Sequence, residues 1–481
     1  MHLDGMLLKS VLPNVELINF NDSEDISFSV DSRSVLSNEV FIALKGAKVD
    51  GHDYLSEALK NGAGGLMLKH SEKERLSGID PELLKSKLLI IVEDTFDALI
   101  HLAASWRKKF SCPIVAITGS VGKTSTKQIV GNICLRANQK VFISKGNQNT
   151  LLGVSLNILR MRNVEAAVFE VGINKRGEMA QIAKLLNPTI GVITNVGHSH
   201  MEGLGTLVDI SSEKRDIFKS FQESSIGIIN GDSVYLSGIG YSHPVLKFGS
   251  KTINQIQARK IKIGINGIDF ILKIYTEKFN VHLDTFHEGL VYNSLAAASV
   301  AHVLKISAKT IVEGISEQLK ITGRFEKKNI SGGRGILIDD CYNANPESVK
   351  SALVAFNRIS TSFKKVIILS DMNELGEDSP FWHRQIGRFL RKIDSSSYVI
   401  LMGKMVQWVA KTVPFGIKVD CVSDYQETLD LLEPLMETQK LCILVKGSTF
   451  AYTSGLVKLV KALTEGAAAM PTKNIEKRIQ V

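Results

Sequence analysis

The sequence predicts an α/β protein of three domains. Its 481 residues correspond to about three domains at roughly 100–200 residues each. Two separate stretches of the chain alternate short apolar runs with helical segments, which is typical of a largely parallel sheet covered by helices. The first stretch contains "PIVAIT", "AAVFEVG", "IGVITNVG" and "SIGIING", and the second contains "GILIDD", "KVIILSD", "SYVILMG" and "LCILVKG".

We place the domain boundaries at 1–108, 109–321 and 322–481. The N-terminal domain is predicted to be a small α/β unit, with strands at "ISFSV", "VFIAL" and "LLIIVED" and a helix at "YLSEALKNGAGG". The central domain is a parallel-sheet unit with a hairpin appended at "KIKIGINGIDFILKIYT" and a helix at "YNSLAAASVAHVL". The C-terminal domain is predicted to be Rossmann-like and to end in a flexible polar tail.

Composition excludes several classes of function. The net charge is +9, but the lysines and arginines are scattered, so nucleic acid is not expected as a partner. The five cysteines are far apart and form no C-x-x-C pair, which argues against a zinc or redox site. No stretch reaches the roughly 18 apolar residues of a membrane span, and the N-terminus is not a secretory signal. We expect a cytoplasmic monomer with reduced thiols.

The central domain begins with a candidate phosphate-binding loop, "TGSVGKTST" at 118–126. The common ATPase spacing would need glycine where Ile117 stands, but an apolar strand precedes the loop and a helix follows it. In that context the glycines let backbone N–H groups surround a phosphate, Lys123 can bridge phosphate oxygens and the Thr124 hydroxyl can bind Mg²⁺. The alternative is a glycine-rich turn with an exposed lysine. The predicted ATP-binding residues here are Gly119, Ser120, Val121, Gly122, Lys123, Thr124 and Ser125.

A carboxylate at the end of the next buried strand is a candidate metal ligand. Glu170 ends "AAVFE", and strand ends in an open α/β sheet face the ligand crevice. A carboxylate there can hold Mg²⁺ beside the nucleotide phosphates. The alternative is an ion pair with Lys175 or Arg176, which is less favoured because a charge on a buried strand is costly.

Two histidines and a lysine follow. His198 and His200 lie in the loop of "GVITNVGHSHMEGLG", and with Glu170 on a neighbouring strand one of them is a candidate ligand for a second metal ion. The helical pattern of "SSEKRDIF" alone predicts that Lys214 is a surface lysine.

The short loop G-x-x-G-K-T resembles that of the Mur ligases and of folylpolyglutamate synthase, which form amides at the expense of ATP. The resemblance implies that Glu170 and His200 bind Mg²⁺, with two ions in the site, and that Lys214 is carbamylated and helps to position the metal. It implies catalytic roles for Lys123, Glu170, His200 and Lys214. It assigns no role to His198.

The N-terminal stretch "VDSRSVLSNEVFIALKGAKVDGHDYLSEALKNGAGG" resembles the uridine-nucleotide-binding domain of this family. Taken alone, its motif residues are ordinary turn residues. The resemblance implies that a UDP-linked substrate is bound by residues of these turns and of "GNQNTLLGV", namely Ser32, Arg33, Lys45, Gly46, Asp50, Gly51, His52, Asn147 and Asn149.

Within the family, "YNANP", "DMNELGEDSPFWH" and "KGS" resemble the members that add D-alanyl-D-alanine to a UDP-N-acetylmuramoyl tripeptide. The implied reaction activates the tripeptide carboxylate as an acyl phosphate, in the last step of precursor synthesis for peptidoglycan. The alternatives are a family member that adds the third-position amino acid, and a phosphate-loop ATPase without ligase activity.

The last predicted ATP contacts come from three places. Arg324 begins the C-terminal domain, where a guanidinium can reach a phosphate once the domains close, or can form an interdomain salt bridge. Asp340 can accept hydrogen bonds from the ribose, and Asp339 is the alternative. Asn293 keeps part of the G-x-H-N motif of the family, but Gly289 stands where its histidine is expected, so how adenine is held is open.

Overall fold

The computed structural model describes residues 5–20, 26–47, 49–199, 201–264, 266–317, 321–448 and 455–466. Its strands form three sheets, one in each third of the chain, which gives the three-domain α/β fold that the sequence predicts. The predicted C-terminal tail lies outside the described residues. In the described part of the chain, no helix is long and apolar enough to cross a membrane.

The N-terminal sheet has five strands in the order β1-β5-β4-β3-β2, of which β1 alone runs antiparallel to its neighbour. The strands are β1 (Glu16–Ile18), β2 (Ser27–Ser29), β3 (Glu39–Ile42), β4 (Gly65–Lys69) and β5 (Leu88–Val92). The helices are α1 (Gly5–Val11), η1 (Gly51–Tyr54), α2 (Leu55–Lys60), η2 (His70–Gly78), α3 (Pro81–Leu84) and α4 (Thr95–Arg107). The predicted helix is therefore shorter than "YLSEALKNGAGG", because α2 stops before Gly62, whose φ is +102°.

The central sheet has nine strands in the order β14-β13-β12-β11-β10-β9-β6-β8-β7. The strands are β6 (Ile114–Thr118), β7 (Val141–Ile143), β8 (Ala166–Glu170), β9 (Ile190–Ile193), β10 (Ile226–Asn230), β11 (Val245–Gly249), β12 (Ile256–Gly264), β13 (Gly267–Ile274) and β14 (Glu277–Leu283). Strands β6 to β12 pair in parallel, and the predicted hairpin is confirmed as the antiparallel pair β12–β13, which β14 extends.

Helices cover both faces of the central sheet, which explains why β6, β8 and β9 are buried at every position. The helices of this domain are α5 (Lys123–Arg136), α6 (Leu151–Arg160), α7 (Glu178–Leu186), α8 (Met201–Leu204), α9 (Leu207–Arg215), η3 (Asp216–Phe218), α10 (Val234–Ser237), α11 (Gly289–Val303) and α12 (Ala308–Ser316).

The C-terminal sheet has six strands in the order β15-β16-β20-β17-β18-β19, parallel except for β15. The strands are β15 (Glu326–Asn329), β16 (Gly335–Asp340), β17 (Lys364–Ser370), β18 (Tyr398–Met402), β19 (Lys418–Val422) and β20 (Leu441–Lys446). The helices are η4 (Ser331–Gly333), α13 (Pro346–Asn357), η5 (Gly376–Asp378), α14 (Ser379–Phe389), η6 (Leu390–Lys392), η7 (Val406–Thr412), α15 (Tyr425–Thr438) and α16 (Gly455–Glu465).

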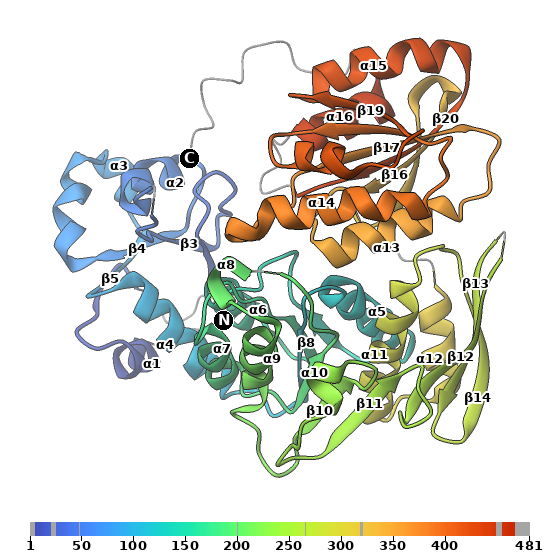
Figure 1. Cartoon of the computed structure of the whole chain (residues 1–481). Coiled ribbons are helices and arrows are strands. Elements are labelled where there is room, and N and C mark those ends of the chain that lie inside the picture. The colour runs from blue at the N-terminus through green and yellow to red at the C-terminus, as the bar shows by residue number, and fades with distance from the viewer. Residues whose placement is uncertain are drawn as a thin grey trace.

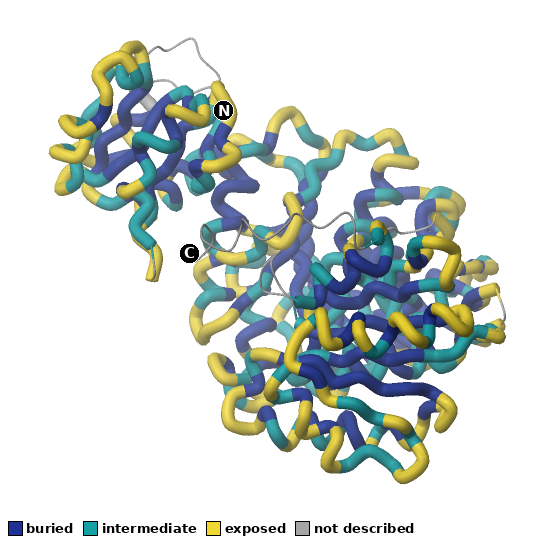
Figure 2. Tube along the Cα trace, turned by 90° about the horizontal axis from the view of Figure 1, so that it is seen from above, coloured by how far each residue is buried: buried dark blue, intermediate teal, exposed yellow. Residues whose placement is uncertain are grey.

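Helix α4 fixes the N-terminal domain to the central one. The Trp106 indole N–H donates to the Met161 carbonyl over 3.2 Å, and Arg107 Nε donates to the Leu186 carbonyl over 2.6 Å. Figure 2 shows the N-terminal domain as a lobe with its own buried centre. In Figure 1 the C-terminal domain, in orange and red, lies over the central domain with α13 and α14 between the two sheets. The candidate site lies at this second junction.

Candidate active site between the central and C-terminal domains

The loop between β6 and α5 has the backbone shape of a phosphate-binding loop. Gly119 has a φ of +146° and Gly122 a φ of +85°, conformations that side chains with a Cβ rarely adopt. A Cβ at Gly119 would collide with the Thr194 side chain, and one at Gly122 would collide with Asn293. Both glycines are therefore needed for the close approach of β9 and α11 to this loop.

The phosphate loop is held from behind by the segment that follows β9. The Ser120 hydroxyl donates to the Gly197 carbonyl and accepts from the Gly197 N–H, each over 2.9 Å. The Val121 N–H donates to Asn195 Oδ1 over 2.8 Å. Lys123 Nζ donates to the Gly119 carbonyl over 2.8 Å, so its ammonium group lies across the mouth of the loop.

Glu170 is buried at the carboxyl end of β8, as the sequence predicts. Its Oε1 accepts from Asn149 Nδ2 over 2.9 Å, and its Oε2 lies 3.4 Å from Lys127 Nζ. Burial raises the pKa of Glu170, but Lys127, Lys123 and the Asn149 amide together hold it below its usual value. The basic partner is therefore Lys127, and the alternative ion pair with Lys175 or Arg176 is wrong.

Lys127 is a site residue that the sequence analysis missed. Its fully buried ammonium group donates to the carbonyls of Ser144, over 3.0 Å, and Gly146, over 2.8 Å. One helical turn separates it from Lys123 in "KTSTK", so both side chains lie on the same face of α5. That spacing was the available signal.

Lys214 is buried, with 1% of its surface exposed, so its interpretation as a surface lysine is wrong. Burial, reinforced by the positive charge of Lys123, holds the pKa of Lys214 well below its usual value, although Glu213 acts in the opposite direction. His200 lies outside the described residues. Among those that are described, no group of three or more His, Cys, Asp or Glu side chains forms a metal cluster.

The C-terminal domain brings two of its predicted residues to the phosphate loop. Arg324 Nη2 lies 3.4 Å from the Thr124 hydroxyl, and the guanidinium stacks 4.1 Å above the Tyr342 ring. Asp340 is buried and pairs with Lys446 over 2.9 Å. Of the two alternatives at the strand end, Asp340 is the one that faces the domain junction.

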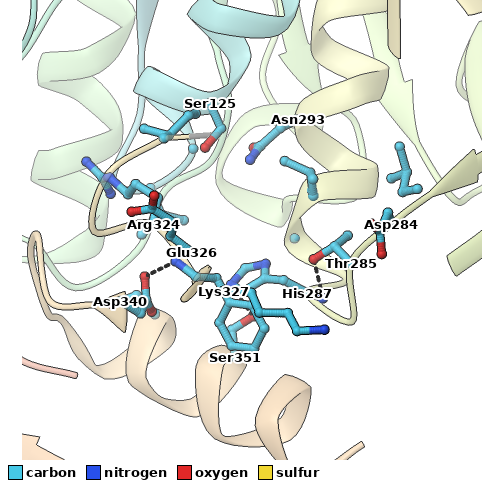
Figure 3. A pocket seen from close by; sticks show the side chains of 18 of the residues that line it. Ser125, Asp284, Thr285, His287, Asn293, Arg324, Glu326, Lys327, Asp340 and Ser351 are labelled. Carbon is cyan, nitrogen blue, oxygen red and sulfur yellow. Dashed lines mark hydrogen bonds between the residues drawn. The ribbon is translucent and has the colours of Figure 1, made fainter. Parts of the chain in front are cut away.

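A cavity of about 580 Å³ lies between the central and C-terminal domains. Its walls include Ser125 and Asn293 from the central domain and Arg324 and Asp340 from the C-terminal one (Figure 3). The volume suits a nucleotide-sized ligand, because ligand pockets commonly measure about 300–1,000 Å³. With the phosphate loop at one end, the cavity is positioned for a nucleotide triphosphate.

His287 is the histidine that this cavity contains. Its ring packs 5.4 Å from that of Phe325, and its Nε2 lies 3.4 Å from the Ser351 hydroxyl (Figure 3). A Cβ at Gly289 would come within 2.7 Å of the His287 ring. The His287 ring thus occupies the space that a side chain at position 289 would need. A motif with fixed spacing cannot reveal this, because His287 lies two residues before the expected position.

Comparison with known proteins agrees with this architecture. Three family models match the chain in order: the Mur ligase family catalytic domain at 27–107, the Mur ligase middle domain at 117–301, and the Mur ligase glutamate ligase domain at 323–449. The UDP-N-acetylmuramoyl-tripeptide--D-alanyl-D-alanine ligase of Bacillus subtilis is 31% identical over 85% of this chain and 87% of its own. The chain belongs to the Mur ligase family.

Other Mur ligases resemble it over similar lengths. The ligase of the same name from Escherichia coli is 30% identical over 91% of this chain and 93% of its own. A crystal structure of MurF from Acinetobacter baumannii superposes with a TM-score of 0.81 at 26% identity, covering 97% of this chain and 100% of that one. MurF from Thermotoga maritima in complex with ADP superposes with a TM-score of 0.75 at 26% identity, covering 92% and 97%.

The substrate-binding residues predicted from the Mur ligase motifs gather in two turns of the N-terminal domain. Arg33 pairs with Asp31 over 2.8 Å, and the buried Ser32 donates to Glu57 over 3.2 Å. Of these three turn residues, the Arg33 side chain is the most open to solvent, with 72% of its surface exposed. Contact between Arg33 and a substrate stays a prediction, because its guanidinium is held by Asp31 through two hydrogen bonds in this structure.

The second turn is built around a buried histidine. His52 Nδ1 contacts Asp50 over 2.6 Å, and its Nε2 accepts from the Lys69 N–H over 3.2 Å. Lys45 forms an isolated β-bridge with Asp50, and Gly46 and Gly51 close the turn on either side of it. In this structure His52 stabilises the turn, and direct contact with a substrate stays a prediction.

Asn147 and Asn149 lie elsewhere. Asn149 contacts Glu170, and its backbone N–H donates to the Asn147 carbonyl over 2.7 Å. The loop that carries both residues therefore lies beside Glu170 at the carboxyl end of β8. A substrate that reaches from the N-terminal turns to these asparagines would extend across both domains.

Proposed function

We propose that this Mur ligase joins the terminal carboxylate of a UDP-N-acetylmuramoyl tripeptide to the amine of D-alanyl-D-alanine, with conversion of ATP to ADP and phosphate. The observation that carries the proposal is the meeting of Lys123, Glu170 and Arg324 at the phosphate loop, beside the interdomain cavity that Arg324 lines. Use of ATP accords with the family and with the MurF relative described in complex with ADP.

The reaction divides into two displacements. An oxygen of the tripeptide carboxylate attacks the γ-phosphorus of ATP, the bond to the bridging oxygen breaks and ADP leaves. The amine then attacks the acyl carbon of the acyl phosphate, loses a proton, and expels inorganic phosphate. Phosphorylation is needed because a carboxylate oxygen is otherwise a poor leaving group.

The residues of this chain contribute positioning and charge. Lys123 lies at the mouth of the phosphate loop, and Arg324 reaches the same loop from the other domain. Two cations held at the phosphate loop would stabilise the charge that spreads over the oxygens of the transferred group in the transition state. Closure between the domains also excludes water, which would otherwise hydrolyse the acyl phosphate.

Mg²⁺ fits the residues beside the loop. The Thr124 hydroxyl and the Glu170 carboxylate are the hard oxygen donors that this ion prefers. Among the residues described, the buried Glu170 Oε2 has no hydrogen bond, and it forms an ion pair with Lys127 at 3.4 Å. When bound there, Mg²⁺ neutralises charge on the nucleotide phosphates. A second ion held by His200 remains part of the proposal.

A carbamate on Lys214 is a separate prediction, and the rest of the proposal does not depend on it. Carbon dioxide reacts with a neutral amine, and burial favours the neutral form of Lys214 by lowering its pKa. Intact mass measured under gentle conditions, or rescue of Lys214→Ala by a short carboxylic acid, tests for it.

The direct test of the reaction is ATP-dependent formation of the amide. The protein is incubated with UDP-N-acetylmuramoyl tripeptide, D-alanyl-D-alanine and ATP, and the products are weighed by mass spectrometry. The expected product is the tripeptide nucleotide extended by the dipeptide, with equimolar ADP. Release of ADP without amide product would instead favour an ATPase without ligase activity.

A further inference from the structure

One side chain after β9 contacts two helices of the C-terminal domain. His198 Nδ1 forms a short hydrogen bond with the carboxylate of Glu347, in the first turn of α13. The His198 ring also lies 4.1 Å, between centroids, from the indole of Trp382 in α14. His198 therefore contacts both helices that face the central domain in Figure 1.

The backbone beside His198 is bonded directly to the phosphate loop. Gly197 exchanges two hydrogen bonds with Ser120, each 2.9 Å long. A Cβ at Gly197 would lie 3.2 Å from the Glu347 carboxyl carbon, so Glu347 rests on this glycine. Gly197, His198 and Glu347 thus form one continuous chain of contacts from the phosphate loop to α13.

The hydrogen bond between His198 and Glu347 is partly shielded from solvent. The His198 side chain is 22% exposed and that of Glu347 is 36% exposed. Glu347 Oε2 and Trp382 Nε1 are both buried, and neither has a hydrogen-bond partner within the described part of the chain. A hydrogen bond to a carboxylate in such surroundings is stronger than one on an open surface.

We propose that His198, Glu347 and Trp382 form a latch that holds the C-terminal domain closed on the phosphate loop. His198 is then a positioning residue. It acts through Glu347 and α13 to keep Arg324 and Asp340 at the nucleotide, without touching the reacting atoms itself. The consequence for catalysis rests on the proposed function, whereas the closure requires only a nucleotide.

The test is a double-mutant cycle with His198→Ala, Glu347→Ala and the double variant. Three quantities are measured: the Kd for a nonhydrolysable ATP analogue, the radius of gyration with and without it, and the Kd for UDP-N-acetylmuramoyl tripeptide. Each single variant should raise the nucleotide Kd by about tenfold, the loss expected for a hydrogen bond to a charged group. The double variant should be no worse than either single one, because the two residues act as a pair.

Further readouts separate a latch from a merely structural contact. The Kd for the UDP substrate should not change, and nucleotide-dependent compaction should weaken. His198→Asn should recover most of the nucleotide affinity, since its amide nitrogen can replace Nδ1 as the donor to Glu347. His282→Ala is the matched control, because His282 pairs with Asp269 over 2.8 Å within a single domain.

Unchanged nucleotide affinity and compaction in His198→Ala, or effects that simply add in the double variant, would overturn the latch. If His198→Ala does not fold, Trp382→Leu is measured in the same way and must loosen closure. Neither binding nor scattering needs an amide product. Compaction with nucleotide in a protein that does not ligate would support the latch and contradict the proposed function. Ligation without nucleotide-dependent compaction would contradict the latch and support the proposed function.

Discussion

The ammonium group of Lys127 lies 3.4 Å from the carboxylate of Glu170, and both side chains are buried. The same ammonium group donates to the carbonyls of Ser144 and Gly146, so three contacts fix its position. Lys127 therefore holds Glu170, together with the loop after β7, in place beside the phosphate loop.

Lys127→Met is expected to damage both stability and activity. Methionine fills much of the same volume but leaves Glu170 as a buried carboxylate without its cation. Breaking a buried ion pair in this way costs about 3–5 kcal/mol. Chemical denaturation and the rate of ADP release measure the two effects. Arg136→Met, at an exposed ion pair with Glu317, is the control and should change neither. A Lys127→Met enzyme as stable as the parent would contradict the assignment.

Lys123→Ala should remove most turnover while the fold persists. The lysine supplies a fixed positive charge at the phosphate loop, and the loss of one such group commonly lowers kcat by about 10²–10³-fold. The measurement is ADP release under saturating substrates, with circular dichroism to confirm folding. ATP turnover that is unaffected by this change would contradict the role of the loop.

Asp340→Asn and Asp339→Asn should separate the nucleotide role from a structural one. Asp340 lines the cavity, whereas Asp339 pairs with Lys328 over 2.6 Å. Asp340→Asn is expected to raise the KM for ATP about tenfold, as for a lost hydrogen bond to a charged group. Both variants should lower the melting temperature, because each breaks an ion pair, but Asp339→Asn should leave that KM unchanged. Interchanged results would show that the wrong aspartate has been assigned.

His287 and Gly289 provide a test of how the nucleotide base is held. His287→Ala should raise the KM for ATP, because it removes a wall of the cavity. Gly289→Ala should do the same, since its new methyl group would displace the His287 ring. Nucleotide titrations measure both variants, and Ala296→Gly in α11 is a control for the helix itself. A Gly289→Ala enzyme with normal ATP affinity would show that the position of this ring is unimportant.

Asp232 should make stability depend on acid pH. Burial raises the pKa of Asp232, but hydrogen bonds donated by Ser250, Lys251 and Asn254 lower it by more. The pKa of Asp232 is therefore below its usual value. A depressed pKa stabilises the fold above the unfolded-state pKa, and that contribution is lost as the pH falls through the folded-state pKa.

Asp232→Asn should therefore cost about 1–2 kcal/mol at pH 7, allowing for partial exposure, and progressively less below about pH 4. Urea denaturation across this pH range measures it. Asp430→Asn, on an exposed helix face, is the control. A difference that stays constant with pH would contradict the role of the Asp232 charge.

The sequence predicts well what is local or repeated along a strand. The phosphate loop and the position of Glu170 follow from strand, loop and helix order, because parallel strands end at one edge of a sheet. For Arg324 the sequence left a phosphate contact and an interdomain salt bridge both open. Lys127 could also have been predicted as a site residue, because it lies one helical turn from Lys123.

What could not be predicted depends on distant packing. The burial of Lys214 reflects neighbours that a single helix pattern does not record, and His287 reaches the cavity from outside the expected motif spacing. The contact between His198 and Glu347 joins residues 149 positions apart. No periodicity in either segment signals it.

The proposed reaction is tested most directly by a panel of amines. Purified protein, ATP and UDP-N-acetylmuramoyl tripeptide are combined with D-alanyl-D-alanine, or with single amino acids including D-alanine, D-glutamate and L-lysine, and ADP release and product mass are followed together. Rapid, stoichiometric formation of ADP and amide with the dipeptide, and little with any single amino acid, is the predicted result. Faster amide formation with a single amino acid, or ADP release that ignores the amine, would contradict it.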